Sequence, residues 1–532
     1  MSELLQDFIF DTARKTPDAE ALVYGAERLD YRALAQAVRA AAAAFGAAGI
    51  KRGERIAVYL EKRIETVSAL FGAAAAGAVF VPVNPLLKPE QVAYILADCN
   101  VRILVTSPER LRQLQPALAA CPDLRTVFVT GADADAGAGA GGALPVLAWD
   151  TALATHADAA ELTLRRIDQD VAAILYTSGS TGRPKGVVLS HRNMVAGARS
   201  VADYLAIAPT DRLLAVLPLS FDYGLSQLSC AFLCGAGAVL LNHLFARDVV
   251  KAVVDERITG LAAVPPLWSQ LARLDWSAAT SLRYLTNSGG ALPRATVDAL
   301  RERLPQAELF LMYGLTEAFR STYLPPAELG RRPDSMGRAI PNAEVMVVRP
   351  DGSRCAPHEP GELVHRGALV ALGYWNDPVK TAERFRPAPG QDPALPLPEM
   401  AVWSGDTVRA DEEGYLYFIG RSDEMIKVSG YRVSPTEIEE VVSATGLVEE
   451  AACFGVPHPE LGQAVVLVAA GDGAAVPALL AECKRRLPAY MVPLHVAPHP
   501  GQLPRNPNGK IDRKALQSGF LTLFDPSAKT SS

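Results

Sequence analysis

Two patterns of apolar and polar positions take turns along the first 320 or so residues of the chain: stretches typical of helices and short runs typical of strands. Stretches with helical spacing are separated by short β-rich runs: 55–60, 101–106, 171–177, 212–218 and 238–245. Strands that alternate with helices are typical of α/β layers whose sheets are mainly parallel. The pattern therefore predicts an α/β fold over this part of the chain.

Two uncharged runs, Thr66 to Leu87 and Tyr223 to Ala246, are long enough to cross a bilayer. The first ends in VFVPVNP, a β-branched run with a proline turn, and the second contains several polar side chains. We predict that each run forms a buried helix followed by a buried strand.

The pattern changes after residue 340. From Ile340 to Ile419, short strands separated by turns predict a small antiparallel sheet or barrel. From Asp423 to Leu516, two helical and two β-rich stretches predict a separate α+β domain of about 95 residues. Gly131 to Ala143 is low in complexity and predicts a surface loop.

These patterns divide the chain into three parts. Residues 1–422 are expected to form two layered α/β subdomains and a small β-barrel, residues 423–518 a smaller α+β domain, and residues 519–532 a flexible tail.

Composition excludes several classes of protein. The chain has 532 residues, of which 49% are hydrophobic and 21% charged, unlike a disordered protein. Lys and Arg total 52 against 58 Asp and Glu, with no basic block, which argues against nucleic-acid binding.

The seven cysteines are scattered, and the first residues lack the charge and apolar core of a signal peptide. A reducing cytoplasm is the expected location. Cys230 and Cys234 are four residues apart, but nothing nearby completes a metal site, so packing is the expected role.

A phosphate-binding loop is indicated after the apolar run 171–175. The sequence YTSGSTGRPKG, Tyr176 to Gly186, combines glycines that let backbone N–H groups approach, hydroxyl donors, and the charge of Lys185. It does not match the Walker A pattern. A glycine-rich loop alone is equally compatible with a simple turn.

The full eleven-residue string resembles the nucleotide-binding loop of the adenylate-forming superfamily, which includes acyl-CoA synthetases, luciferases and the adenylation domains of nonribosomal peptide synthesis. Four further motifs are similar to this superfamily in the same order: LMYGLTE (311–317), WSGD (403–406), GRSDEMIK (420–427) and NPNGKID (506–512).

The resemblance implies roles for these residues. ATP and Mg²⁺ are the implied cofactors. Tyr313 would stack on adenine, and Gly314 beside it would belong to the same nucleotide site. Asp406 would contact the ribose, Thr316 a phosphate, and Glu317 the metal. Lys185 would hold the departing phosphates and Lys510 would bridge the carboxylate and the α-phosphate.

Asp423 would be the hinge about which the smaller domain turns before a thiol attacks the adenylate. The implied nucleotide-binding set also contains Thr177, Ser178, Gly179, Ser180, Thr181, Gly182 and Arg421.

Asp222, in PLSFDYG, stands where amino-acid adenylation domains carry an Asp that pairs with the substrate ammonium, whereas acyl-CoA synthetases often carry His. The alternative is a structural Asp that caps the following helix.

Arg320 maps to a pocket-lining position, and its forked guanidinium suits a carboxylate that accepts two hydrogen bonds. Ser288 maps to another wall and could share that carboxylate. An internal pair of Arg320 with Asp222 or Glu317 is the alternative. The full set expected to line the pocket is Phe221, Asp222, Tyr223, Ser226, Ser288, Gly289, Met312, Arg320 and Ser321.

Together these residues predict an amino dicarboxylic acid as substrate, such as aspartate, a methylated aspartate or glutamate, with the activated carboxyl left open. The chain resembles stand-alone enzymes that load amino dicarboxylates on carrier proteins, and the strings LPLSFDYG and GLTEAFRSTYLPP resemble ligases that accompany exosortase systems. A separate carrier protein is the favoured thiol partner and coenzyme A the alternative.

Two other functions compete with this one. An acyl-CoA or aryl-CoA synthetase is supported by the stretch NPLLKPEQVAYIL (84–96). A catalytically silent adenylate-binding protein is disfavoured because Lys185, Glu317 and Lys510 are all present.

Overall fold

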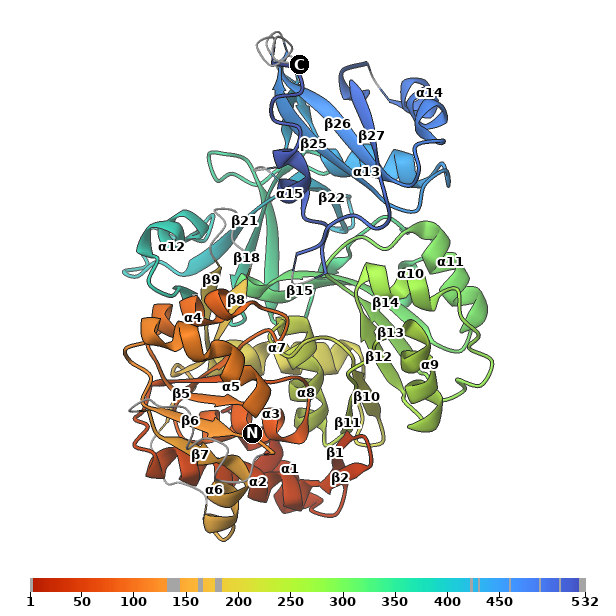
Figure 1. The fold of residues 1–532 in the computed structure, drawn as a ribbon. Coiled ribbons are helices and arrows are strands. Elements are labelled where there is room, and N and C mark those ends of the chain that lie inside the picture. The colour runs from red at the N-terminus through yellow and green to blue at the C-terminus, as the bar shows by residue number, and fades with distance from the viewer. Residues whose placement is uncertain are drawn as a thin grey trace.

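The computed structural model describes residues 3–131, 144–160, 166–177, 184–421, 424–428, 431–458, 461–487, 489–506 and 509–525. Most of the predicted low-complexity loop Gly131 to Ala143 lies outside them. Figure 1 shows a large N-terminal part, coloured red to green and cyan, with a smaller blue C-terminal part above it. This division and the mixed α/β architecture confirm the predicted fold class.

The two large sheets of the N-terminal part are mainly parallel, as the alternating pattern predicts. Antiparallel pairs lie at both edges of the first sheet and at one edge of the second. In spatial order, the described residues form one sheet from β16 (Arg338–Ala339), β15 (Phe319–Leu324), β14 (Glu308–Leu315), β13 (Tyr284–Asn287), β12 (Gly260–Ala263), β10 (Arg212–Ala215), β11 (Gly237–Leu240), β1 (Glu20–Tyr24) and β2 (Glu27–Asp30). The other consists of β19 (Gly373–Tyr374), β9 (Lys185–Ser190), β8 (Val171–Thr177), β4 (Val79–Pro82), β3 (Arg55–Tyr59), β5 (Val101–Thr106), β6 (Thr126–Val129) and β7 (Val146–Ala148).

Helices cover these sheets and fill the space between them, where α7 and α8 pack together (Figure 1). The helices of the described residues are α1 (Asp7–Lys15), α2 (Tyr31–Ala47), α3 (Ile64–Ala75), α4 (Pro89–Asp98), α5 (Pro108–Leu114), α6 (Trp149–Thr155), α7 (His191–Tyr204), α8 (Asp222–Cys234), α9 (Ala246–Asp255), α10 (Pro265–Leu271), α11 (Arg294–Arg303), α12 (Pro378–Arg384), α13 (Pro435–Ser443), α14 (Val476–Arg486) and α15 (Arg513–Ser518).

Both uncharged runs form a helix followed by a strand, as predicted: α3 with β4, and α8 with β11. Among the described residues, no helix is both long enough and apolar enough to cross a membrane. The strand predicted at 238–245 is shorter than expected and ends at Leu240, because the polar residues Asn242 and His243 follow in a loop.

Strands after residue 340 form an antiparallel sheet, one of the two predicted alternatives. Its strands in the described residues are β17 (Ala343–Val348), β18 (Gly361–Gly367), β21 (Met400–Ala410) and β20 (Phe385–Pro387), with β22 (Leu416–Arg421) also paired to β21.

The C-terminal part has its own sheet and apolar cores on both of its faces. Its described strands are β24 (Tyr431–Val433), β23 (Ile426–Val428), β26 (Gly462–Ala470), β25 (Ala451–His458) and β27 (His495–His499). The two helices and two strands predicted for this part are all present, as α13, α14, β25 and β26.

Candidate active site

The hairpin of β14 and β15 carries residues that the sequence assigns to both the nucleotide and the acid. Gly314 pairs with Arg320, and the turn between the strands contains Thr316 and Glu317. A Cβ on Gly314 would lie 2.1 Å from the carbonyl oxygen of Phe319, so only glycine fits. Phe319 itself has a φ of 51°, which is unusual for a residue with a side chain. Because the two strands approach closely at Gly314, the backbone positions of Glu317 and Arg320 are fixed relative to each other.

Tyr313 and Asp406 meet at one end of the site. The Tyr313 hydroxyl donates a hydrogen bond to the Asp406 carboxylate, and Arg421 Nη1 lies 3.4 Å from Asp406 Oδ1. Burial raises the pKa of Asp406, while the positive charge of Arg421 opposes the rise. The structure thus brings together Tyr313, Asp406 and Arg421, three residues that the resemblance assigns to the nucleotide.

His365 was missed by sequence reasoning. It lies on β18, is 1% exposed, and its ring stacks on Tyr313 with centroids 6.0 Å apart. Burial lowers the pKa of His365 to about 3, so the ring is neutral. Neither ring nitrogen has a hydrogen-bond partner within the described part of the chain. A single His in a β-rich run carries no signal that would have identified this position.

Glu317 is held by a tyrosine that the sequence did not identify. The Tyr374 hydroxyl donates to Glu317 Oε1 at 2.6 Å, and the Lys185 ammonium lies 5.1 Å from the centroid of the same ring. Tyr374 reaches this point because β19 pairs with β9, which begins at Lys185. Strand β19 has only two residues and is distant in sequence from the motifs of Lys185 and Glu317. Such a short strand gives no sequence pattern from which this contact could be predicted.

The remaining phosphate-loop residues can be placed only in part. Thr177 ends β8 and pairs with Lys185 across the hairpin. Ser178, Gly179, Ser180, Thr181 and Gly182 lie outside the described residues. Desolvation and the nearby cations Lys380 and Arg384 lower the pKa of Lys185.

Asp222 is buried at the first turn of α8, with 8% of its surface exposed. It does not cap the helix: the N-cap residue is Phe221, and no side chain caps this end. Instead Asp222 Oδ1 accepts a hydrogen bond of 3.3 Å from Thr316 Oγ1. The capping interpretation is therefore wrong, because the helix begins at Asp222 itself and the carboxylate faces the Thr316 turn.

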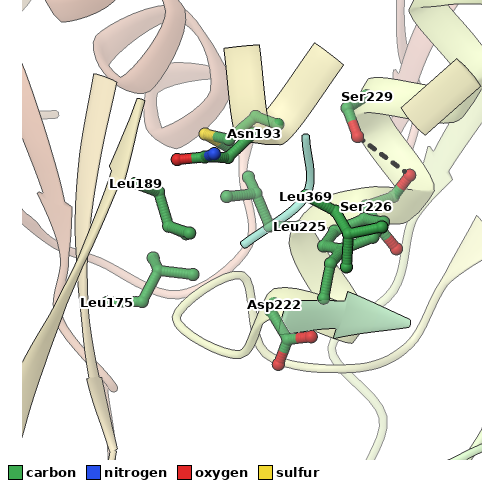
Figure 2. Close-up of a pocket in the computed structure, with 10 residues that line it drawn as sticks. Leu175, Leu189, Asn193, Asp222, Leu225, Ser226, Ser229 and Leu369 are labelled. Atoms are coloured by element: carbon green, nitrogen blue, oxygen red, sulfur yellow. Dashed lines mark hydrogen bonds between the residues drawn. The ribbon is translucent and has the colours of Figure 1, made fainter. Parts of the chain in front are cut away.

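Figure 2 shows a small pocket beside this carboxylate. Asp222, Ser226 and Ser229 come from α8, Asn193 from α7, and Leu175 and Leu189 from the neighbouring sheet. Burial raises the pKa of Asp222, and the charge of Arg320 is the largest effect in the opposite direction. The pocket is otherwise mostly apolar.

Arg320 is buried and, among the described residues, lacks a hydrogen-bond partner. It is 1% exposed, and its Nε, Nη1 and Nη2 atoms all have no acceptor there. The guanidinium lies 5.0 Å from the centroid of the Tyr223 ring and 4.4 Å from that of Phe319. Within the described parts of the chain, no carboxylate lies within 4.0 Å of it, so the expected alternative of an internal ion pair is absent.

The other expected pocket residues differ in their surroundings. Ser321 is fully buried, and its hydroxyl has no partner among the residues that the structure describes. The Met312 sulfur accepts a hydrogen bond from Tyr204, and the Tyr223 hydroxyl pairs with Thr286 at 2.6 Å. Gly289 has a φ of 85° and faces Phe221, while Ser288 is buried beside it. No hydrogen bond in the described structure links Ser288 to Arg320.

Lys510 extends from the C-terminal part toward the same site. Its backbone N–H donates to Asn506 Oδ1 at 3.1 Å. Desolvation of its ammonium group and the charge of Arg421 lower the pKa of Lys510, whereas the Asp406 and Asp222 carboxylates act to raise it. Lys510 is therefore close enough to interact electrostatically with both carboxylates. Asp423, the predicted hinge, lies outside the described residues.

The described residues contain no group of three or more His, Cys, Asp or Glu side chains placed to hold a metal. Burial raises the pKa of Cys230 to about 12 and that of Cys234 to about 11, so both remain thiols. These values fit the expected packing role.

Comparison with known families gives two matches. A model described as AMP-binding enzyme matches residues 9–375, and one described as AMP-binding enzyme C-terminal domain matches residues 437–510.

Similar proteins include ligases of two kinds. The chain is 34% identical to the L-proline–[L-prolyl-carrier protein] ligase of Streptomyces coelicolor, over 95% of this chain and 94% of that protein. It is 32% identical to the sulfoacetate–CoA ligase of Cupriavidus necator, over 94% and 93%. It is also 30% identical to tyrocidine synthase 3 of Brevibacillus parabrevis over 97% of this chain, but spans only 8% of that protein's length.

Among solved structures, ATP-bound MatB from Rhodopseudomonas palustris superposes with a TM-score of 0.84 at 26% identity, over 99% of this chain and 100% of that one.

Proposed function

Because the chain belongs to the family of AMP-binding enzymes, we propose that it is an AMP-forming acid–thiol ligase that activates an amino dicarboxylic acid. In this reaction a carboxylate oxygen attacks the α-phosphorus of ATP, and the bond to the bridging oxygen breaks. Pyrophosphate leaves with the electron pair. A thiol then attacks the acyl-adenylate and releases AMP. The protein supplies position and charge rather than a covalent intermediate.

The nucleotide side of the site is supported by its charge arrangement. Asp406, beside Tyr313 and Arg421, is placed to accept hydrogen bonds from ribose hydroxyls. The charges of Asp406 and Asp222 both act on Lys510, so its ammonium would supply positive charge where the carboxylate and the α-phosphate meet. Because both groups are negative, a cation between them reduces their repulsion during attack.

Glu317 fits a role at Mg²⁺. Magnesium in nucleotide sites is commonly bound by one or two carboxylates together with phosphate oxygens, and it neutralises charge that develops on the phosphates. The Tyr374 hydrogen bond at 2.6 Å fixes one oxygen of Glu317 and leaves the other available. The described residues thus suit a metal that is shared with ATP rather than held by the protein alone.

The single observation that carries the substrate class is the unpartnered guanidinium of Arg320. A buried charge without a partner is costly, so proteins almost always pair it. Here all three nitrogens lack an acceptor in the described structure, and aromatic rings flank the group. A substrate carboxylate would supply the missing acceptors in the fork geometry that arginine favours.

Asp222 supports an amino group on the same substrate. Its carboxylate is buried and its pKa is raised, so a substrate ammonium would stabilise the ionised form. Asp222 accepts a hydrogen bond from Thr316, the residue to which the resemblance assigns a phosphate contact, so Asp222 would lie on the phosphate side of the acid. An ammonium there lies close to the carboxyl that is activated. This favours activation of the α-carboxyl, with the side-chain carboxylate at Arg320.

The thiol partner is a carrier protein in the favoured version of this proposal. One full-length relative is named as a carrier-protein ligase. The alternative is a CoA ligase for an acid that carries a second anion but no amino group. It is supported by the sulfoacetate–CoA ligase relative and by the raised pKa of Asp222, since a protonated Asp222 needs no ammonium.

Substrate-dependent ATP–pyrophosphate exchange tests both versions. The panel contains aspartate, 3-methylaspartate, glutamate, neutral amino acids, succinate and fatty acids. We expect exchange with an amino dicarboxylate, and equal exchange with fatty acids would contradict the proposal. Succinate above aspartate would favour the CoA-ligase alternative.

Monomethyl esters of the best amino dicarboxylate distinguish the two carboxyls. Esterification of the α-carboxyl should abolish exchange, because no free α-carboxylate remains to attack ATP. Esterification of the side chain should weaken binding but leave some exchange. The opposite pattern would assign activation to the side-chain carboxyl.

A further inference from the structure

Helix α4 (Pro89–Asp98) contains much of the stretch 84–96, to which the nucleotide motifs give no role. Its C-terminal end lies beside the hairpin of β8 and β9, the two strands that carry the ends of the phosphate-binding sequence (Figure 1). The last carbonyl groups of a helix have no partner within the helix and must find one elsewhere. Asp98, the last residue of α4, therefore offers a backbone carbonyl as well as a carboxylate to other segments.

Both acceptor groups of Asp98 are used. The Tyr176 hydroxyl donates a hydrogen bond to Asp98 Oδ2. Trp375 Nε1 donates to the Asp98 carbonyl oxygen at 3.0 Å, and Asn376 Nδ2 donates to the same oxygen at 2.7 Å. Because α4, β8 and the segment after β19 are far apart in sequence, Asp98 is a single residue that joins three separate parts of the chain.

Two of the joined segments carry groups of the candidate active site. Tyr176 lies at the end of β8, which pairs there with Lys185 at the start of β9. Trp375 directly follows Tyr374, whose hydroxyl donates to Glu317. The position of Asp98 therefore affects both Lys185 and the tyrosine that holds Glu317.

Further contacts hold the partners of Asp98 in place. Burial raises the pKa of Tyr176, so its hydroxyl keeps its proton and remains a donor. The Trp375 backbone N–H donates to the Gly186 carbonyl oxygen at 2.7 Å. The Arg55 guanidinium lies 5.0 Å from the centroid of the Trp375 ring. The connection through Asp98 thus runs between segments that are themselves fixed.

We propose that Asp98 is a positioning residue for adenylation, which holds the β8–β9 hairpin and the Tyr374 segment together so that Lys185 and Glu317 meet Mg·ATP in one arrangement. The inference rests on the adenylation reaction proposed above. Asp98 touches no substrate and acts through Tyr176 and the residues after β19. A small displacement of groups that orient a reactant is costly to the rate, so loss of this connection weakens the use of ATP.

A double-mutant cycle tests whether the hydrogen bond between Asp98 and Tyr176 has this role. In exchange assays, we expect Asp98→Ala and Tyr176→Phe each to raise the KM for Mg·ATP by about 10-fold. The double variant should show no larger rise, because both substitutions remove the same bond. Asp98→Asn keeps an acceptor and should restore most of the affinity. The KM for the acid, and thioester formation from preformed acyl-adenylate, should not change.

Tyr417→Phe is the matched control. It removes another tyrosine hydroxyl that donates to a carboxylate, that of Asp411 at 3.1 Å, and should leave the KM for Mg·ATP unchanged. A rise of about 100-fold in the double variant would overturn the inference, because the two residues would then act independently. An equal rise in the KM for the acid would also overturn it, since the role of Asp98 would then be structural.

Direct binding separates failure of this inference from failure of the proposed function. Calorimetric titration of the full-length protein with a non-hydrolysable Mg·ATP analogue requires no carboxylic acid. Binding that is about 10-fold weaker in Asp98→Ala, in Tyr176→Phe and in the double variant would support the role of Asp98 even if no tested acid were activated. Equal affinity in Asp98→Ala and the unsubstituted protein would overturn it.

Discussion

The Arg320 guanidinium lies 5.0 Å from the centre of the Tyr223 ring, and none of its nitrogens has a hydrogen-bond acceptor among the described residues. A cation over an aromatic face gains about 2 kcal/mol when desolvated, less than the several kcal/mol that burial of an ion costs. The protein therefore holds this charge at a cost to its own stability, which a bound anion would recover.

Replacement of Arg320 by Met should separate stability from activity. Without ligand, we expect the free energy of unfolding to stay the same or to rise by about 1–3 kcal/mol, because an uncompensated buried charge is removed. Exchange with an amino dicarboxylate should fall by roughly 10- to 100-fold. Urea unfolding and exchange kinetics measure the two effects.

Arg332→Met is the matched control. Arg332 is also buried, at 6% exposure, but it pairs with Glu328, Asp411 and Glu413. Its loss leaves these carboxylates without their partner and should lower stability by about 1–3 kcal/mol. If Arg320→Met destabilised the protein as much as Arg332→Met, Arg320 would have a structural partner. If exchange in Arg320→Met fell as much with a neutral amino acid as with the dicarboxylate, Arg320 would not bind the second carboxylate.

Asp222 should impose a pH dependence on amino substrates. Burial raises its pKa above 3.8, so the folded state binds this proton more tightly than the unfolded state. Its carboxylate, and with it ammonium binding, is lost as the pH falls through the raised value. We therefore expect the KM for an amino dicarboxylate to rise in this acidic interval. Exchange kinetics measured against pH would show it.

Asp222→Asn should remove this dependence and raise the KM at neutral pH. The same linkage predicts that stability falls as the pH rises from 3.8 through the raised pKa, and that the Asn variant lacks this fall. A substrate without an amino group should give the same KM profile in both proteins. An amino dicarboxylate profile that Asn leaves unchanged would remove Asp222 from ammonium binding.

Lys510→Ala should block adenylation and spare the second half-reaction. The ammonium lies near both Asp406 and Asp222, where attack on ATP is proposed, so its loss should reduce exchange by about 100-fold or more. Reaction of preformed acyl-adenylate with thiol should proceed at the normal rate. The exposed Lys484 on α14 offers a control in the same part of the chain. Loss of both half-reactions would mean a folding defect or a different role.

Tyr374→Phe tests the hydrogen bond to Glu317 while it keeps the ring under Lys185. We expect the KM for Mg·ATP to rise roughly 10- to 100-fold, equivalent to one hydrogen bond to a charged group, with more Mg²⁺ needed for half-maximal exchange. Tyr31→Phe, which removes a distant bond to Ala236, should affect stability but not this KM. An unchanged magnesium requirement in Tyr374→Phe would count against a metal at Glu317.

Gly197→Ala should disturb the pocket of Figure 2, in which we expect part of the acid to bind, through Phe319. A Cβ at Gly197 on α7 would lie 2.4–2.9 Å from the Phe319 ring, so the ring must shift. We expect a loss of stability of about 1–3 kcal/mol and a higher KM for the acid, with the KM for ATP little changed. Gly46→Ala on α2 has open space around it and should be neutral or stabilising. Equal effects of the two substitutions on the KM for the acid would show that Phe319 does not shape the pocket.

The sequence predicted the fold well where local patterning decides it. The alternation of β-rich and helical runs identified strands such as β3, β5 and β8, and the uncharged runs were correctly assigned to helix and strand. The ordered motifs pointed to the family that the matches over residues 9–375 and 437–510 confirm. These features depend on residues that are close in sequence.

Contacts between distant segments could not be predicted in this way. Tyr374 reaches Glu317 through a two-residue strand, and His365 stacks on Tyr313 from another sheet. The sequence also could not show whether Arg320 forms an internal ion pair. The same residue types are present whether the guanidinium has a carboxylate partner or not. Whether Asp222 caps α8 likewise required the structure, which shows its carboxylate accepting from Thr316 instead.

Glu317 and Arg320 belong to one hairpin, in which Gly314 has no room for a Cβ and Phe319 has a φ of 51°. An inserted or deleted residue there would move the proposed metal ligand and the proposed acid-binding residue together. Evolutionary change of substrate in this scaffold is therefore expected to proceed by exchange of side chains at fixed backbone positions. Helix α8 lies outside that hairpin, and its Ser226 lines the pocket. Side chains on α8 should therefore tolerate such exchanges better than those of the hairpin.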